Sequence, residues 1–361
     1  MTQPVQHRSK TALIVLGLFI FAVALMMLPS YRLLVEPRGQ AFDLFWIWAG
    51  GQAILTGQNP YGPETTRVIQ QGVFNKDIPA DQYQHGFPHP AHIAFILLPF
   101  VAVPFFWSVL AWISLQIPLF LAILLLGFRV LQWEIRPAPL FLLTLLALLG
   151  FRYPVNVYVL GQLIFFVLFC LVLAIWLYQQ RYPGWAAIAL AAATIRPDLS
   201  LLAILLALLL TRRSPHRTRF FTTLLVAGLA LIVLPAIFIG PLWPITWISA
   251  IFSYGSNPFA TWPPALLPWP LTILIIALSM LWAGRYILLS WRRPGPFHYA
   301  LTISATLLVG LLILPQTGSY TLTFALVPAV VLLRYAASRW LQLLIGLSLL
   351  TPWLYFALGP P

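Results

Sequence analysis

Long apolar runs, separated by short polar segments, make up most of the chain from residue 11 onward. About twenty apolar residues in a helix are enough to cross a bilayer, and backbone that faces lipid must satisfy its own hydrogen bonds. The pattern therefore predicts an all-α, polytopic transmembrane bundle of about eleven spans, within a range of about ten to twelve, in one integral domain over residues 1–361. The expected spans are 11–30, 90–103, 105–128, 138–152, 160–179, 183–211, 219–239, 269–290, 297–314, 320–334 and 339–357.

Proline interrupts two of the apolar runs, because it removes an intrahelical hydrogen bond and clashes with the preceding turn. Pro104 separates the runs 90–103 and 105–128. The pattern leaves open whether 90–103 crosses the membrane or re-enters it on the same side. Pro197 divides the run 183–211 into either one broken crossing or two short helices.

The segment 31–88 is the longest polar interruption of this pattern. Residues 41–55 are aromatic but too short to cross a bilayer, so they predict a helix lying in the membrane interface. Glycine, asparagine and proline in residues 57–63 are typical of a turn. Residues 64–71 predict a second short helix.

Composition and charge add the orientation of the chain. It is 61% hydrophobic and only 7% charged, whereas soluble domains carry about 25% charged residues. No basic face with exposed aromatic residues indicates nucleic-acid binding. The net charge of +13 comes almost wholly from arginine, and basic residues mark cytoplasmic loops. We therefore expect a multi-pass protein of the cell membrane, with a cytoplasmic N-terminus and with segment 31–88 on the extracytoplasmic side. The loops expected to be cytoplasmic contain Arg212, Arg213, Arg217, Arg219, Arg292, Arg293, Arg334 and Arg339.

The acidic residues concentrate in one place, since five of the seven lie in segment 31–88. Asp43 is the strongest candidate for chemistry, because a carboxylate beside a sugar hydroxyl can take its proton as general base. The alternative is an acid that only favours the local helix dipole, or an ordinary solvated charge.

Two charges flank Pro197 inside an apolar run, Arg196 and Asp198. Intramembrane charges are costly and indicate a functional site by default, and the planar fork of arginine suits phosphate. The alternative is that Arg196 and Asp198 neutralise each other. Arg38 is a second candidate for phosphate binding, or a contact to lipid headgroups.

The remaining candidates are uncharged or neutral polar side chains. His85, His89 and His92 have a spacing that would suit zinc on one helix face, but Pro88 and Pro90 interrupt that helix. We therefore expect no metal and no cofactor. His89, His92 and Gln162 are predicted instead to contact substrate, although Gln162 at the start of an apolar helix would also suit a backbone cap. Cys170 is the only cysteine, so no intrachain disulfide is possible.

The order of five short motifs resembles that of a known family: Phe42-Asp43, Gly57-Gln58-Asn59-Pro60-Tyr61, Phe87-Pro88-His89-Pro90, Leu160-Gly161-Gln162 and Ile195-Arg196-Pro197. The chain resembles the GT-C membrane glycosyltransferases, specifically glycosyltransferase family 87, which includes polyprenol-phosphate-mannose-dependent α-1,2-mannosyltransferases. The resemblance covers about residues 38–205. It departs from the family where a Tyr-Pro-Pro is replaced by Phe87-Pro88-His89-Pro90.

The resemblance implies a catalytic base, a donor and an acceptor. Asp43 takes the position of the base, and Arg196, with Arg38, takes that of the cations that hold the donor phosphate. Residues Asn59, Tyr61, His89, His92 and Gln162 take those of sugar or acceptor contacts. The implied reaction moves a hexose, mannose by resemblance, from a polyprenyl monophosphate to a lipid or glycan acceptor, with inversion and without a metal. Residues 1–239 would form the shared half and residues 240–361 a variable set of helices.

Two other functions fit a polytopic chain. A transporter or lipid flippase would explain many helices and the charges at Arg196 and Asp198, with a site near the midplane between repeats. A non-catalytic membrane protein of envelope biogenesis would leave Asp43 pointing at solvent.

Overall fold

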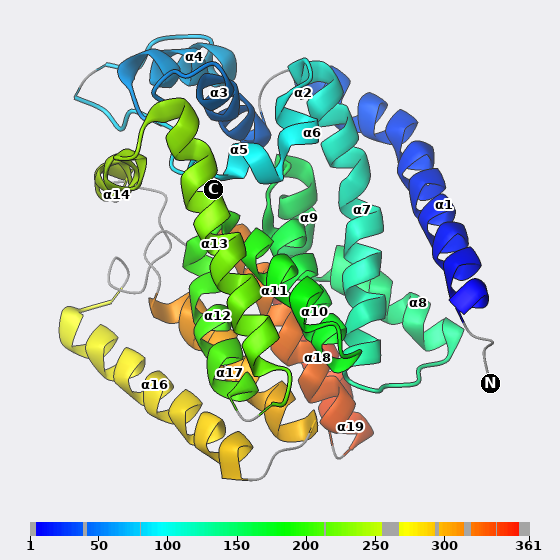
Figure 1. The fold of residues 1–361 in the computed structure, drawn as a ribbon. Coiled ribbons are helices and arrows are strands. Elements are labelled where there is room, and N and C mark those ends of the chain that lie inside the picture. The colour runs from blue at the N-terminus through cyan, green and yellow to red at the C-terminus, as the bar shows by residue number, and fades with distance from the viewer. Residues whose placement is uncertain are drawn as a thin grey trace.

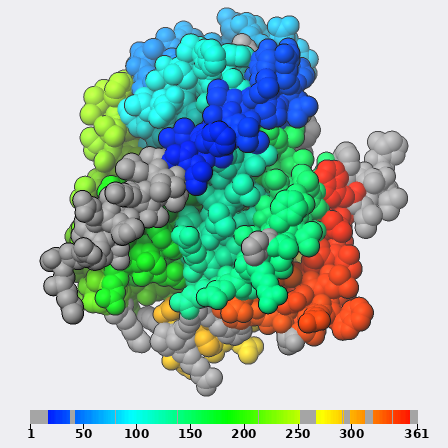
Figure 2. All heavy atoms as spheres, turned by 90° about the vertical axis from the view of Figure 1, so that its right-hand side faces the viewer, coloured from blue at the N-terminus to red at the C-terminus, as the bar shows by residue number. Residues whose placement is uncertain are grey.

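The computed structural model describes residues 5–38, 42–79, 81–212, 214–254, 267–292, 296–313, 319–336 and 338–353. Every regular element in these ranges is helical, and no strand occurs among them, which confirms the all-α prediction. Long helices run roughly side by side, and a group of short helices, α2 to α6, lies at one end of them (Figure 1). From the side, the residues of these short helices cover the same end, above those of α7 to α9 (Figure 2).

The helices fall into three length classes. The longest are α1 (Val5–Ser30), α7 (Phe105–Val130), α13 (Arg217–Ile239), α16 (Trp269–Arg292) and α17 (Pro296–Ile313). Those of intermediate length are α3 (Asp43–Leu55), α4 (Pro63–Phe74), α8 (Pro137–Leu145), α9 (Arg152–Leu160), α10 (Ile164–Gln179), α11 (Pro183–Ala192), α12 (Pro197–Thr211), α14 (Trp243–Tyr254), α18 (Leu326–Tyr335) and α19 (Arg339–Ser348). The shortest are α2 (Glu36–Arg38), α5 (Ile93–Ile96), α6 (Leu98–Val101), two π-helical turns (Tyr31–Val35 and Leu146–Gly150) and two 3-10 segments (Ala193–Ile195 and Ser319–Ala325).

Several of these helices could span a membrane. Within the described ranges, four are long and apolar enough: Gly17–Val35, Phe105–Val130, Arg217–Ile239 and Trp269–Ser290. A fifth candidate is the pair Ala138–Gly150 and Arg152–Leu160, which is bent by 68° at Phe151. The other apolar helices are shorter, so helix length and composition account for four or five of the expected spans.

The structure decides between the alternatives at both proline breaks. Residues 90–103 contain two helices of four residues each, too short to cross a bilayer, so they do not form the single transmembrane helix that was one of the two alternatives. Residues 183–211 form two short helices, α11 and α12, joined by a 3-10 turn and by Arg196 with φ −127° and ψ 79°.

The two helices expected in segment 31–88 are confirmed as α3 and α4. Pro63 stands in the first turn of α4, where its missing N–H costs nothing. Helix α3 also satisfies the backbone at the end of α6, because Trp48 Nε1 donates to the Val103 carbonyl at 2.8 Å and Gln52 Nε2 to that of Val101 at 2.5 Å. The short helices are thereby tied to one another by polar contacts.

Glycines let α3 pack closely against its neighbours. A Cβ at Gly50 would lie 2.3 Å from the ring of Phe87, and one at Gly72 of α4 would lie 2.1 Å from the ring of Phe45. Both rings belong to the main core, in which Phe45 and Phe87 are 4% and 2% exposed. Neither ring has room to yield.

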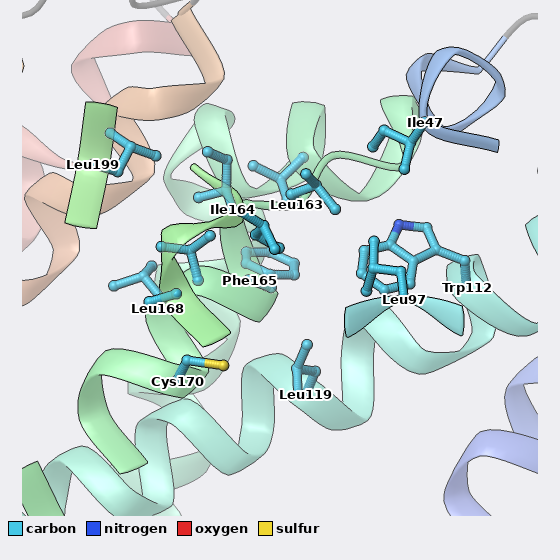
Figure 3. Close-up of a cluster of buried hydrophobic side chains, with 14 of the residues drawn as sticks. Ile47, Leu97, Trp112, Leu119, Leu163, Ile164, Phe165, Leu168, Cys170 and Leu199 are labelled. Atoms are coloured by element: carbon cyan, nitrogen blue, oxygen red, sulfur yellow. The ribbon is translucent and has the colours of Figure 1, made fainter. Parts of the chain in front are cut away.

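The main core includes a cluster between α7 and the start of α10. Trp112, Ile164 and Phe165 are 0% exposed, and Figure 3 shows them in one apolar cluster with Leu97 and Leu168. Trp112 of this cluster also contacts the turn between α9 and α10, at Gly161.

The close contact at Gly50 predicts a specific loss of stability. Gly50→Ala should lower the free energy of unfolding by about 1–3 kcal/mol, because the added methyl group displaces the buried Phe87 ring. The matched control is Gly284→Ala in α16, where a Cβ meets nothing within 4 Å. Thermal unfolding in detergent, followed by tryptophan fluorescence, measures both; equal midpoints for the two variants would contradict the expected clash.

Candidate active site

Asp43 stands at the first position of α3 and is directed inward. The residue before it, Phe42, has extended backbone and a side chain 1% exposed, so the core anchors the start of the helix. An acid in the first turn is favoured by the helix dipole. The carboxylate of Asp43 is partly buried and accepts a hydrogen bond at Oδ2 from Gln162 Nε2. Asp43 therefore does not point at bulk solvent.

Gln162 reaches Asp43 from the turn between α9 and α10. Helix α9 ends at Gly161, which adopts the left-handed conformation with φ +69°. A Cβ at Gly161 would also lie 3.2 Å from Ile113 Cδ1, so this position favours glycine twice over. The backbone N–H of Gln162 donates to the Val157 carbonyl at 3.0 Å. The turn thus presents a buried glutamine, 7% exposed, to the start of α3.

Arg196 and Asp198 form the ion pair that the sequence left open. Arg196 Nε donates to Asp198 Oδ1 at 2.9 Å, and Nη2 donates to Oδ2 at 2.6 Å. The side chain of Arg196 is 10% exposed and that of Asp198 is 27% exposed. The break before α12 makes this geometry possible, because both side chains leave the same turn around Pro197.

The two candidate histidines lie on the segment that precedes α5. His92 Nε2 is 3.1 Å from the hydroxyl of Thr194, two residues before Arg196. The backbone carbonyl of His89 accepts a hydrogen bond from the Tyr61 hydroxyl at 3.0 Å. The neighbouring carbonyl of Pro88 accepts one from Trp247 Nε1 of α14 at 3.1 Å. This segment is therefore held from two sides.

The electrostatics join these groups into one cluster. Burial raises the pKa of Asp43 to about 6, while the hydrogen bond from Gln162 and the charge of Arg196 act to lower it. Burial lowers the pKa of His89 to about 3, and the charge of Arg196 lowers it further, against the opposite effect of Asp198. At neutral pH the cluster therefore holds an ionised carboxylate and a neutral imidazole.

Not all of the expected site residues join this cluster. Asn59 is exposed, and its Oδ1 accepts a hydrogen bond from the Tyr61 amide at 3.0 Å, so it shapes the turn before α4. The side chain of Arg38 lies outside the described residues. Among the described part of the chain, no group of three or more His, Cys, Asp or Glu side chains is placed to hold a metal ion.

Sequence reasoning missed three residues that hold the cluster together. Thr194 contacts His92, Trp112 Nε1 donates to the Gly161 carbonyl at 2.8 Å, and Trp247 holds the Pro88 carbonyl. The only signal for Thr194 was its hydroxyl in an alanine-rich helix two residues from Arg196. The two tryptophans gave no signal among fifteen in the chain.

An apolar groove lies along the surface of α13, and α12 contributes only Leu208 to it. It is open, with a volume of about 500 Å³. At one end, the Ile232 carbonyl accepts a hydrogen bond from Trp243 Nε1 at 2.9 Å, and the Trp243 ring centroid is 6.1 Å from that of His92. The groove is lined by Leu208, Phe221, Leu224, Leu225, Gly228, Leu229 and Ile232.

The chain was compared with protein-family models, curated proteins and solved structures, and it matches none of them. No relative therefore supplies a family or an activity for it.

The ion pair predicts a non-additive stability effect. Arg196→Met should lower the free energy of unfolding by about 3 kcal/mol, because it leaves the Asp198 carboxylate without its partner in a largely buried place. The double variant Arg196→Met, Asp198→Leu should recover most of that loss. A double-mutant cycle of unfolding in detergent tests this; purely additive losses would contradict the pair as described.

Proposed function

We propose that this chain is a membrane glycosyltransferase of the GT-C type, which moves a hexose, mannose by resemblance, from a polyprenyl monophosphate to a lipid or glycan acceptor. The observation that carries the proposal is the buried carboxylate of Asp43, held by Gln162 within range of the Arg196 charge. A base and a cation in one cluster fit a reaction that removes a proton from one substrate and releases an anion from the other.

The proposed chemistry uses both groups in one step. Asp43 takes the proton of the acceptor hydroxyl, and the acceptor oxygen forms a bond to the anomeric carbon of the sugar. The bond from that carbon to the phosphate oxygen breaks, and the polyprenyl phosphate leaves with the electron pair. Attack from the face opposite the phosphate inverts the anomeric centre. Arg196 stabilises the charge that develops on the leaving phosphate, so the step needs no metal or cofactor.

The pKa of Asp43 suits a general base. A base is most effective when its pKa lies near the working pH, because it is then ionised and still able to hold a proton. With a pKa of about 6, Asp43 is mostly ionised at pH 7 and is a stronger base than an ordinary aspartate.

The groove along α13 suits the isoprenoid part of such a donor. The groove is open along α13, where its lining residues Leu225 and Leu229 are 64% and 51% exposed, so an extended apolar chain could lie along it. All of its lining residues are apolar, and its Ile232 end approaches His92 through Trp243. A chain in the groove would therefore place its phosphate end toward the polar cluster.

The length of α13 supports an active site on the extracytoplasmic side. Its 23 residues extend over about 34 Å, close to the thickness of the hydrocarbon core. Basic residues Arg217 and Arg219 stand at its first turn, as expected for a cytoplasmic end. The carbonyl of Phe238 in its last turn faces Gly57, beside α3. Without residues 90–103, we propose that the shorter apolar helices complete a total of about ten spans, the lower end of the expected range.

The remaining candidates take supporting roles in this proposal. Neutral His89 can donate one hydrogen bond and accept another, which suits sugar hydroxyls. His92 has Nδ1 left for such a contact, because its Nε2 pairs with the Thr194 hydroxyl. Tyr61 holds the His89 segment in place. Asn59 acts indirectly by shaping the turn before Tyr61. Arg38 is proposed, from its place in the sequence alone, as a second contact to the donor phosphate.

The proposal predicts that Asp43→Asn abolishes sugar transfer while the protein remains folded. Wild-type activity should fall as the pH drops through about 6, because protonation of Asp43 removes the base. The assay incubates purified protein with radiolabelled polyprenyl-phosphate hexoses and a membrane lipid extract, and it detects a new labelled glycolipid.

The matched control is Asp77→Asn, which removes an acid from the same polar segment. Asp77 is 54% exposed and pairs with Arg67. It has no role in the proposed reaction, so transfer should persist. Full activity of Asp43→Asn would remove the assignment of the base, and absence of transfer by the wild-type protein from every donor would remove the proposed reaction.

The groove predicts a second outcome. A Cβ at Gly228 meets nothing within 4 Å, so Gly228→Phe should fill the groove without disturbing the helix. The KM for a long-chain polyprenyl donor should rise about tenfold, equivalent to about 1.4 kcal/mol, while a donor with a short chain should be little affected. Gly284→Phe, at an open position on α16, is the control, and equal KM changes in both variants would contradict a role for the groove.

A further inference from the structure

Gln162 is held from behind by two side chains of α7. Trp112 and Gln116 are four residues apart and so lie on one face of the helix. Trp112 Nε1 donates to the carbonyl of Gly161 at 2.8 Å, and Gln116 Nε2 donates to the carbonyl of Gln162 at 3.4 Å. One face of α7 therefore binds two consecutive carbonyls of the turn that delivers Gln162 to Asp43.

Burial of the Gln116 side chain costs folding free energy, because one of its polar atoms lacks a partner in the described part of the chain. It is 0% exposed within an apolar helix, and its Oε1 has no hydrogen-bond partner among the described residues. Buried amides are normally satisfied, so an exception needs an explanation, and polar residues in membrane helices mark functional sites by default. Packing alone would be served better by leucine at this position. The contact that Gln116 does make is with the backbone of Gln162.

The direction of the Gln162 side chain is fixed by the chemistry of its partner. An ionised carboxylate only accepts hydrogen bonds, so the amide NH₂ of Gln162 must face it. The bond occupies Oδ2 of Asp43 and restricts rotation of the carboxylate. It also favours the ionised form of the acid, because a donor stabilises the charge.

We propose that Gln162 is a positioning residue that orients the Asp43 carboxylate and keeps it ionised, and that Trp112 and Gln116 hold Gln162 in place. This inference rests on the proposed function for what Asp43 then does, and it assigns Gln162 to the base rather than to the sugar. With Oδ2 bound by the amide, Oδ1 is the oxygen that receives the proton of the acceptor hydroxyl.

The other charged and titratable groups on the helices around α3 can be distinguished from Gln162 in their effect on the ionisation of Asp43. The cation whose charge acts on Asp43 is Arg196. Burial lowers the pKa of His89 and His92 below the ordinary value, so they carry no charge at neutral pH. The charged residues on the other packed helices are Glu64, which is exposed, Arg67, which pairs with Asp77, Arg129 at the last turn of α7, and Arg217 and Arg219 at the far end of α13.

The first test needs no substrate. Dicyclohexylcarbodiimide reacts with protonated carboxyl groups in apolar surroundings, so the pH dependence of its adduct at Asp43, measured by mass spectrometry of the full chain in detergent, reports the ionisation of that group. Gln162→Leu should move the midpoint upward by about one pH unit, because the charged form loses a donor. Gln116→Leu should move it in the same direction by less. The exposed Gln71→Leu in α4 should leave it unchanged.

The second test separates positioning from substrate contact. In the transfer assay, Gln162→Leu should lower kcat about tenfold to a hundredfold, since misplacement of a base by about 1 Å is enough for such a loss, and leave the KM of the donor unchanged. Gln162→Asn keeps an amide donor and should be intermediate. If Gln162→Leu does not fold, Gln116→Leu and Gln162→Asn provide the same comparison.

The outcomes distinguish the two proposals. An unchanged labelling midpoint in Gln162→Leu, or a raised KM with an unchanged kcat, would overturn the positioning role. A different result is that the wild-type protein transfers no sugar from any donor while Gln162→Leu still shifts the labelling midpoint of Asp43. That result would support the coupling of Gln162 to Asp43 and would contradict the proposed transferase reaction.

Discussion

A carboxylate in a largely buried place must be compensated by a donor or a cation, because an isolated charge is very costly away from water. Asp43 meets this requirement with Gln162 and with the charge of Arg196. These partners come from the turn between α9 and α10 and from the break between α11 and α12. One electrostatic requirement therefore brings three distant segments of the chain to the same point.

Side chains stabilise the irregular backbone of these segments. Buried backbone carbonyl groups need hydrogen-bond donors. Here indole and amide groups supply the missing donors: Trp112 for the Gly161 carbonyl, Trp48 and Gln52 for two carbonyls at the end of α6, and Trp247 for the Pro88 carbonyl. The chain can thus interrupt its helices around the cluster without leaving those carbonyl groups unsatisfied.

Features that depend on neighbouring residues could be predicted from the sequence, whereas contacts between residues far apart in the chain could not. Helices α3 and α4 and the break at Pro197 follow from turn residues and proline, and the ion pair of Arg196 with Asp198 joins residues two apart. The contact of Asp43 with Gln162 joins residues 119 apart, which hydropathy does not encode. For residues 90–103 the sequence could not distinguish a span from buried short helices, because burial against α3 needs the same apolar residues as lipid does. The hydrogen bond between Asn59 and the Tyr61 amide within the turn could not be seen in the sequence either.

The contact of Gly72 with Phe45 constrains how the sequence can change. A Cβ at position 72 would lie 2.1 Å from that ring, and the ring itself is enclosed by the core. Any larger residue at 72 therefore requires a smaller one at 45. Phe45 lies two residues after Asp43, in the first turn of α3. A substitution at position 72 of α4 therefore affects the packing next to Asp43, and the two positions are expected to covary through evolution.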